Sequence, residues 1–584
     1  MDSCPPAMTA RTFLVSSPIE ATWPTGERCV FLGSWCLRYS RKSVWSKLEY
    51  EILPYHWDDR RALAADFVRI EMLYELLLPE LASELNRLHG VSHTVKYWRI
   101  VVGWWLYYFT QIFFDRWQVV VGASSMYASA TLMRLPTLNQ YPASNDMASF
   151  IRHALDDAWN ERLIADICNA YTDIEVLVVQ GQECIDGALT DRGVEPVEQV
   201  AMSKRTGFTG RFSLHTSFLP RWQRAKLDLL LGQFPSRRPA AAVPMTEADP
   251  AWRTWSLQCS VDDQFTRALV EAIPRYLPSC YLEGYAEAAQ RASSAFTAKH
   301  QDVILTENAF ATDEIWKMWA AAQCEAGAKL VVAQHGGHYG AGAWSASQHH
   351  EISVSDRYLS WGWSDQREPK VTPAPATRLI GARPRKRQQN GRCLQVVTTV
   401  PRQSYWMFSA PVGPQLEKYL GDQFAFAAEL SSAVRQELLV RLDRNDYGWD
   451  QAERWHDADP AICVDPGTRP LHELLDHTRL YVATYNATTF LESFTQGIPT
   501  VMFWNLEFWE LSESAKPFFD LLREAGVLFD DPVKCASHVN SIWEDVPAWW
   551  ASSDVQSAVK EFCNQYAFVG RRPLRDLKAA LTQW

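Results

Sequence analysis

Alternating strand-like and helix-like segments between residues 393 and 525 constrain the fold of this chain most. Five short apolar runs predict strands, at Cys393–Thr399, Leu438–Leu442, Ala461–Val464, Leu480–Ala483 and Thr500–Phe503. Helix-like segments separate or follow them, at Pro414–Gln436, Leu471–His477, Thr489–Gln496 and Phe508–Ala525. Consecutive strands joined by helices pair in parallel, so this region predicts a doubly wound, Rossmann-like domain.

A βαβ unit occurs earlier in the chain. Val303–Thr306 and Lys329–Ala333 predict two buried parallel strands, joined by a helix that starts at Thr312 and ends near Gly327. The second strand leads directly into Gln334-His335-Gly336-Gly337. A glycine-rich loop after a parallel strand is a common place for a ligand, so this loop is a candidate site.

The 584 residues exceed one compact domain, and the predicted class is α/β. We expect an N-terminal domain with large helical insertions over 1–365, a linker over 366–392, a C-terminal domain over 393–550, and a helix with a tail over 551–584. The linker holds a basic run of Arg383, Arg385, Lys386 and Arg387. The role of residues 182–265 stays open.

The most apolar stretch, Ile100–Phe114, is short of the roughly 20 residues that span a bilayer. It contains Gln111 and is followed by Asp115 and Arg116, so we expect a buried helix. The 12 cysteines form no CxxC pair, which favours reduced thiols. Together with the lack of a signal-peptide pattern in Met1–Ala10, this predicts a cytoplasmic protein. The net charge of −11 argues against nucleic acid as a partner.

The segment Thr484–Thr489 lies between a predicted strand and the next helix, where backbone N–H groups and hydroxyls can hold a phosphate. Asn486, Thr488 and Thr489 are therefore candidates for binding the phosphate of a nucleotide. The alternative is structural, because Thr489 and Glu492 have the T-x-x-E spacing of a capping box. Glu492 is also a candidate for holding ribose hydroxyls.

His335 is the candidate catalytic residue, because a neutral imidazole can accept a proton from an acceptor hydroxyl and a charged one can stabilise a phosphate. Arg441 ends a predicted strand and could hold a phosphate, with a surface salt bridge as the alternative. Asp58 could cap the first long helix or, with Trp57, bind an acceptor sugar.

No metal site is predicted. His338, His349 and His350 match no familiar zinc spacing, and Asp457-Ala458-Asp459 is a D-x-D in a polar loop without further ligands. Neither a G-x-x-x-x-G-K-[ST] loop nor a G-x-S-x-G elbow occurs, which removes the main support for ATPase and α/β-hydrolase functions.

Several motifs in sequence order carry a family resemblance that covers residues 11–574. They are Tyr55-His56-Trp57-Asp58-Asp59-Arg60, Leu85-Asn86-x-x-His89, Tyr97-Trp98-Arg99-Ile100, Asp115-Arg116-Trp117, Gln334-His335-Gly336-Gly337-x-Tyr339-Gly340, Ser360-Trp361-Gly362-Trp363, Tyr485-Asn486-Ala487-Thr488-Thr489-x-x-Glu492 and Gly497-Ile498-Pro499-Thr500. This set resembles a bacterial family of O-antigen and surface-carbohydrate transferases. Its C-terminal half is similar to CDP-glycerol glycerophosphotransferases and other GT-B enzymes.

The resemblance implies a GT-B-like fold, in which two Rossmann-like domains face a cleft. It implies a nucleotide-sugar donor as co-substrate, with no other cofactor, and a glycan acceptor, which a lipid-linked form would bring to the inner face of the membrane. His335 would be catalytic, with Gln334, Gly336, Gly337, Tyr339, His56, Trp57 and Asp58 near the acceptor or cleft. CMP-linked ulosonic acids are one donor class to test. A CDP-glycerol-type polyol-phosphate transferase and a non-catalytic carbohydrate-binding protein remain the alternatives.

Overall fold

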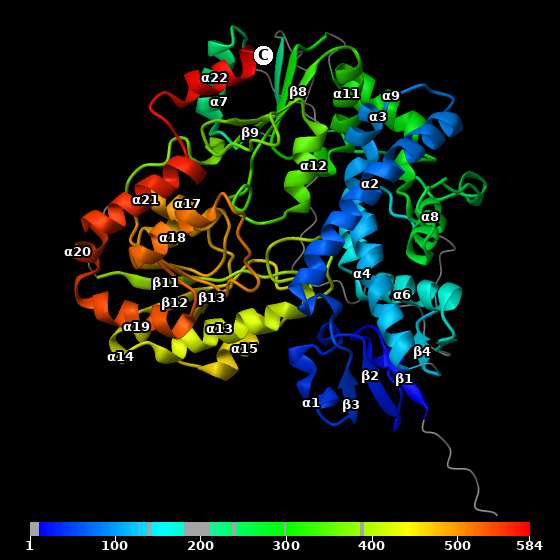
Figure 1. The fold of residues 1–584 in the computed structure, drawn as a ribbon, viewed down its shortest axis with the longest axis horizontal. Helices are drawn as coiled ribbons and strands as arrows, with labels where there is room; N and C mark the ends of the chain where they lie inside the picture. Colours follow the sequence, from blue (N-terminus) through cyan, green and yellow to red (C-terminus); the bar gives the residue numbers. More distant parts are fainter. Residues whose placement is uncertain are drawn as a thin grey trace, which may run out of the picture.

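The computed structural model describes residues 11–127, 129–136, 142–179, 211–215, 218–235, 241–296, 300–385 and 390–584. Within them the chain forms three parallel β-sheets covered by helices, which confirms the predicted α/β class. In Figure 1 the N-terminal sheet lies at the bottom, the central sheet at the top and the C-terminal sheet at the left. Much of the predicted 182–265 region lies outside the described residues.

The N-terminal sheet has the order β3-β2-β1-β4-β5. Its strands are β1 (Thr12–Val15), β2 (Arg28–Phe31), β3 (Tyr50–Ile52), β4 (Thr131–Arg134) and β5 (Glu175–Val178). Its helices, including the α2–α4 insertion, are α1 (Lys42–Trp45), α2 (Arg60–His89), α3 (Val95–Trp98), α4 (Trp104–Met126), α5 (Met147–Ala154) and α6 (Asp157–Tyr171). The sequence predicted β1 and β2 but not a separate sheet, because the strands have only three or four residues and helices interrupt them.

The central sheet has the order β10-β9-β8-β7-β6, so β8 lies in the middle. Its strands are β6 (Phe212–His215), β7 (Val303–Thr306), β8 (Lys329–Ala333), β9 (Arg357–Ser360) and β10 (Val371–Pro373). Its helices are α7 (Arg221–Leu230), α8 (Gln264–Tyr276), α9 (Tyr285–Ala295), α10 (Ala309–Thr312), α11 (Glu314–Glu325) and α12 (Ala346–Val354). The predicted βαβ unit is present as β7, α11 and β8, with Asp313 rather than Thr312 capping α11.

The C-terminal sheet has the order β13-β12-β11-β14-β15-β16, in which the chain reverses direction across the sheet between β11 and β14. Its strands are β11 (Arg392–Val396), β12 (Leu438–Arg441), β13 (Cys463–Asp465), β14 (Thr478–Ala483), β15 (Thr500–Phe503) and β16 (Leu528–Phe529). Its helices are α13 (Leu416–Glu429), α14 (Ser432–Arg435), α15 (Gln451–Ala458), α16 (Leu471–Leu475), α17 (Thr488–Thr495), α18 (Lys516–Glu524), α19 (Pro532–Ile542) and α20 (Val546–Trp550). This is the predicted doubly wound topology, whose reversal point is where such sheets bind ligands.

The chain ends in two helices, α21 (Ser553–Tyr566) and α22 (Pro573–Thr582). The predicted basic tail is therefore partly helical. Helix α21 packs on α17 and α18, whereas Leu577 and Leu581 of α22 belong to the core of the central sheet. Figure 1 shows α22 beside α7, so the end of the chain connects the C-terminal and central sheets.

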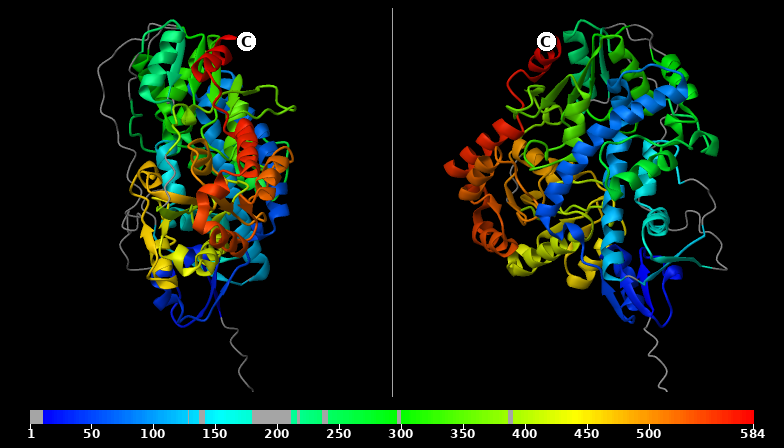
Figure 2. Two further views of the ribbon diagram at one scale, coloured as in Figure 1. Left: turned by 90° about the vertical axis from the view of Figure 1, so that its left-hand side faces the viewer. Right: turned by 45° about the vertical axis from the view of Figure 1, so that its right-hand side comes forward.

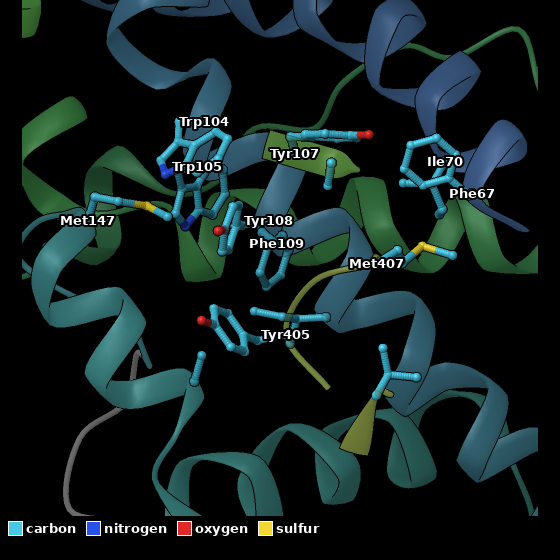
Figure 3. Close-up of a cluster of buried hydrophobic side chains, with 14 of the residues drawn as sticks. Phe67, Ile70, Trp104, Trp105, Tyr107, Tyr108, Phe109, Met147, Tyr405 and Met407 are labelled. Atoms are coloured by element: carbon cyan, nitrogen blue, oxygen red, sulfur yellow. The ribbon is translucent and has the colours of Figure 1, made fainter. Parts of the chain in front are cut away.

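Helices α2 and α4 run between the N-terminal and central sheets (Figure 2). Trp104, Trp105, Tyr107 and Phe109 of α4 are buried, and Figure 3 shows them in one cluster with Tyr405 from the C-terminal part of the chain. The expectation of a buried helix is therefore confirmed. Among the residues that the structure describes, no helix is long and apolar enough to cross a bilayer.

Buried polar contacts join the N-terminal and C-terminal parts of the chain. Arg60 at the start of α2 donates from Nε and Nη2 to the carboxylate of Glu510, at 2.7 and 2.9 Å. Arg402, which follows β11, donates to the Trp35 carbonyl at 2.6 Å and to Asp157 at 2.7 Å. Because a buried charge without its partner is costly, these pairs favour one arrangement of the sheets.

Candidate functional site

A cavity of about 380 Å³, here called the aromatic cavity, lies where α4, the central sheet and the C-terminal sheet meet. Its aromatic lining residues are Trp104, Tyr108, Phe310, Tyr339, Tyr405, Trp406 and Phe408. Its polar lining residues include Asn308, His335, His338, Ser347, Glu351 and Thr488. Lysine and arginine are absent from this lining. An apolar pocket with a few convergent polar groups is the usual form of a small-molecule site.

His335 follows β8 at the centre of the central sheet, and its side chain is 28% exposed. Its Nδ1 lies 3.4 Å from Glu351 Oε1, and its Nε2 lies 3.4 Å from the Tyr339 hydroxyl. Tyr339 in turn donates to Glu351 Oε1 at 2.9 Å. The imidazole is thus oriented by a buried carboxylate on α12, as a base is in other triads.

The negative charge of Glu351 affects the pKa of His335. Burial works against the charged imidazole, but the nearby carboxylate outweighs it, so the pKa of His335 is raised above its ordinary value. His338 is different, because burial lowers its pKa to about 4 and keeps it neutral. Of the two histidines in the loop, His335 is therefore the one with a carboxylate to stabilise its charged form.

Glu351 was not predicted as a site residue from the sequence. Its signal was the spacing of Ser347 and Glu351, which are four residues apart and so lie on one face of α12. The sequence analysis also missed the aromatic residues Tyr108, Tyr405 and Trp406, since no pattern in the sequence connects α4 with the segment after β11.

Gln334 is placed differently from the rest of its loop. It is buried, and its Oε1 accepts hydrogen bonds from the Trp361 backbone N–H at 2.9 Å and from the Trp363 indole at 2.8 Å. Its amide donates to the Gly336 carbonyl at 2.6 Å. Gln334 therefore fixes the shape of the loop and does not line the aromatic cavity, whereas Gly336, Gly337 and Tyr339 do.

Gly337 and Thr488 join the two halves of the site. The Gly337 backbone N–H donates to Thr488 Oγ1 at 3.0 Å. A Cβ at Gly337 would lie 2.6 Å from the Ala487 carbonyl oxygen and 2.7 Å from Leu491 Cδ1. The absence of a side chain thus lets the loop approach the start of α17 this closely.

The capping box predicted at Thr489 and Glu492 is wrong. Helix α17 begins at Thr488 with Ala487 as its N-cap residue, and no side chain caps it. The Thr489 hydroxyl donates to the Tyr485 hydroxyl at 3.0 Å, and Glu492 accepts from Arg378 Nε at 2.7 Å. The Thr489 hydroxyl and the Glu492 carboxylate are therefore bonded to other side chains and do not cap α17.

The reversal point of the C-terminal sheet lies beside the aromatic cavity. A second cavity, of about 220 Å³, is lined there by Thr398 after β11, by Tyr485 and Asn486 after β14, and by His338. Asn486 is 2% exposed, and its Oδ1 has no hydrogen-bond partner among the described residues. This free acceptor makes Asn486 available to a ligand at the reversal point.

Arg441 ends β12 on the same edge of the sheet and donates to the Arg469 carbonyl at 2.8 Å. Burial raises the pKa of Tyr485 to about 12, and Arg441 is close enough to oppose that shift. Arg441 is therefore near Tyr485 but lines neither of these two cavities.

His56, Trp57 and Asp58 lie away from the aromatic cavity. Trp57 is fully buried, stacks on Phe114 and donates from its indole to Asp66 at 2.9 Å. The His56 ring lies 3.5 Å from the buried Asp115, and burial lowers its pKa. Asp58 is exposed, and the predicted N-cap is in fact Asp59, which accepts from the Arg61 N–H at 2.9 Å.

Three of the residues considered as metal ligands are paired with other side chains. His349 Nδ1 lies 2.8 Å from Glu71, and Asp457 and Asp459 pair with Lys42 and Arg435. Within the described ranges, no group of three or more His, Cys, Asp or Glu residues is arranged to hold a metal ion.

Comparisons with known proteins give a family and distant structural likenesses. The family model described as LIC12162 family transferase matches residues 12–581. A comparison with curated proteins gives no match. Three solved structures are similar at low identity.

The first is MurG of Acinetobacter baumannii, at 11% identity and a TM-score of 0.30, covering 52% of this chain and 79% of that chain. The second is WaaG, described as a glycosyltransferase involved in lipopolysaccharide biosynthesis, at 11% identity and a TM-score of 0.28, covering 51% and 95%. The third is a co-structure of S. aureus MnaA with UDP, at 9% identity and a TM-score of 0.31, covering 51% and 79%.

Proposed function

This chain belongs to the LIC12162 family of transferases, and on that premise we propose that it is a glycosyltransferase of surface-polysaccharide biosynthesis. It would transfer a sugar from a nucleotide-activated donor to a glycan acceptor. The observation that carries the proposal is the meeting of His335, which follows a strand of the central sheet, and Thr488, which follows a strand of the C-terminal sheet, in one aromatic cavity.

The proposed reaction takes place at this junction. The acceptor hydroxyl attacks the anomeric carbon, and the bond from that carbon to the donor phosphate breaks. His335 Nε2 takes the proton, while Glu351 stabilises the imidazolium that forms. Tyr405 and Trp406 line the cavity with their rings stacked on each other, 4.4 Å between centroids, and would contact the sugar of a bound substrate.

The leaving phosphate would lie toward α17 and the reversal point of the C-terminal sheet. Asn486, Thr488 and Thr489 would supply hydrogen bonds, and the start of α17 a partial positive charge. Arg441 and Glu492 would contact the nucleotide further along the same edge. The proposal requires no metal ion and no cofactor besides the nucleotide sugar, so activity is expected to survive EDTA.

We place the reaction in the cytoplasm, with a lipid-linked acceptor reached from the inner face of the membrane. The ten cysteines in the described part of the chain are all free thiols, which supports a reducing compartment. The basic run of the linker is the proposed contact to the membrane surface, although Arg385 is paired with Asp476, and Lys386 and Arg387 lie outside the described residues.

A donor panel tests the proposal. The full chain is incubated with UDP-, GDP- and CMP-linked sugars, including a CMP-linked ulosonic acid, and with CDP-glycerol, and donor hydrolysis is followed. Turnover of a sugar nucleotide supports the glycosyltransferase. Turnover of CDP-glycerol alone would favour a polyol-phosphate transferase, and binding without turnover a non-catalytic carbohydrate-binding protein.

A further inference from the structure

A third cavity, of about 910 Å³, has Glu492 of α17 in its lining and shares no lining residue with the aromatic cavity. It is bounded by residues 378–385 after β10, by α16 and α17, and by Pro220 at the start of α7. We call it the arginine cavity, because Arg378, Arg383 and Arg385 line it together with His472, Asp476 and Glu492.

The charges in this cavity are unevenly matched. Three guanidinium groups face two carboxylates, so one positive charge remains when His472 is neutral. The side chain of Arg383 has no hydrogen bond or ion pair with any other described residue. This excess occurs in a chain whose net charge is −11, so the arginine cavity is a local exception to an acidic protein.

Two of the arginines are already held in place. Arg378 donates from Nε to Glu492 at 2.7 Å, and Arg385 donates to Gln496 at 2.5 Å and pairs with Asp476. The two terminal nitrogens of Arg378 have no hydrogen-bond partner among the described residues. An arginine fixed at one edge with its other donors free is pre-organised for a phosphate or carboxylate.

The arginine cavity also has an electrostatic effect on His335, the proposed catalytic base. Arg378 is close enough to His335 that its charge opposes protonation of the imidazole. The aromatic cavity, in contrast, has no lysine or arginine in its lining. Of these two cavities, the arginine cavity is therefore the one with guanidinium groups to pair with a negatively charged ligand.

We infer that the arginine cavity binds a phosphate-bearing group of a substrate, through Arg378 and Arg383. The inference rests on the proposed function, because a glycosyl transfer from a nucleotide sugar has two sources of such a group. One is the phosphate of the donor nucleotide, and the other is the phosphate that links an acceptor to a lipid. Both present oxygen anions to the same guanidinium groups.

Calorimetric titration of the full chain tests this inference with inorganic pyrophosphate, CDP and farnesyl phosphate as probes. Arg383→Ala is expected to weaken pyrophosphate binding by about tenfold or more, the effect of losing a charged hydrogen bond. Arg383→Lys should retain part of the affinity, because it keeps the charge but not the fork. Arg61→Ala, which removes an exposed arginine elsewhere, should leave binding unchanged.

The two organic probes identify the source. A loss of affinity for CDP assigns the cavity to the donor, and a loss for farnesyl phosphate assigns it to a lipid-linked acceptor. If Arg383→Ala and Arg378→Gln both bind all three probes as tightly as the wild type, the inference is overturned.

The experiments distinguish a failure of the proposed function from a failure of this inference. A wild-type chain that turns over no donor in the panel, yet loses pyrophosphate binding in Arg383→Ala, would contradict the glycosyltransferase and keep the phosphate site. A chain that turns over a sugar nucleotide, while Arg383→Ala and Arg378→Gln both keep full affinity for every probe, would support the glycosyltransferase and contradict the phosphate site.

Discussion

The backbone N–H of Gly337 donates a hydrogen bond to Thr488 Oγ1, so the loop that carries His335 is fixed to the first residue of α17. The two residues are 151 positions apart and belong to different sheets. This contact determines how far the proposed base lies from the proposed phosphate site. Even a substitution that adds a single methyl group at Gly337 should therefore lower activity, because it changes this distance.

Gly337→Ala is the first test of this contact. Its Cβ would collide with the Ala487 carbonyl, so the loop and α17 must separate. We expect a loss of about 1–3 kcal/mol in the free energy of unfolding, as for other overpacked sites, together with reduced turnover. Gly421→Ala is the matched control, because Gly421 lies inside α13 with open space around it and should gain about 0.5–1 kcal/mol. Equal melting temperatures for Gly337→Ala and the wild type would contradict the close approach.

Removal of the proposed base is the second test. His335→Ala should fold, because the side chain is partly exposed at the end of a strand. Its turnover in the donor panel should fall by about 10²–10⁴-fold, the usual cost of losing a general base. His456→Ala, which removes an exposed histidine from α15, should keep wild-type turnover. Turnover of His335→Ala within threefold of the wild type would exclude His335 from the mechanism.

The sequence predicted the parts of this site but not how they assemble. The Gln-His-Gly-Gly loop and the start of α17 were both recognised, because each follows a parallel strand and strand ends are visible in apolar patterns. Their contact was not predictable, since no local pattern encodes the packing of Gly337 on Ala487. Glu351 and Tyr405 were missed for the same reason. Trp57 was proposed as a sugar platform because it is aromatic, but its burial depends on Phe114, which is 57 positions away.

The pH dependence of activity tests the pairing of His335 with Glu351. The carboxylate raises the pKa of His335, and the neutral imidazole is the active form of a base. Activity should therefore rise with pH through that raised pKa. In Glu351→Gln the carboxylate charge is gone, so the pKa of His335 should fall and the rising limb of kcat/KM should move to lower pH. A limb that stays in place would show that Glu351 does not act on His335.

His349 gives a test that needs no substrate. Burial works against its charge, but bonds to Glu71 and Glu75 outweigh it and raise its pKa to about 9. Because the pKa is higher in the folded state, the pairs stabilise the fold fully below pH 6.5, less between pH 6.5 and 9, and not above. His349→Gln should therefore lower the free energy of unfolding by about 1–3 kcal/mol at pH 6 and have little effect at pH 10. Denaturant melts at both pH values measure this, and an equal loss at both would contradict the ion pairs.

The last prediction separates the two roles of Thr488. No structural role is predicted for Thr488 from the sequence, yet its Oγ1 accepts from the Gly337 N–H, and its own hydroxyl proton remains available to a donor phosphate. Thr488→Val removes both, and it should cost about 1–3 kcal/mol of stability by leaving a buried N–H unpaired.

Thr488→Ser keeps the hydroxyl and should retain both stability and nucleotide affinity. Thr489→Ala loses the bond to Tyr485 and a proposed phosphate contact but keeps the bond between Gly337 and Thr488, so it should weaken nucleotide binding without separating the loop from α17. Melting curves and nucleotide titrations of all three variants make the comparison. If Thr488→Val loses stability but, once folded, binds nucleotide as tightly as Thr488→Ser, the hydroxyl only joins the two sheets. The proposed phosphate position must then be moved away from α17.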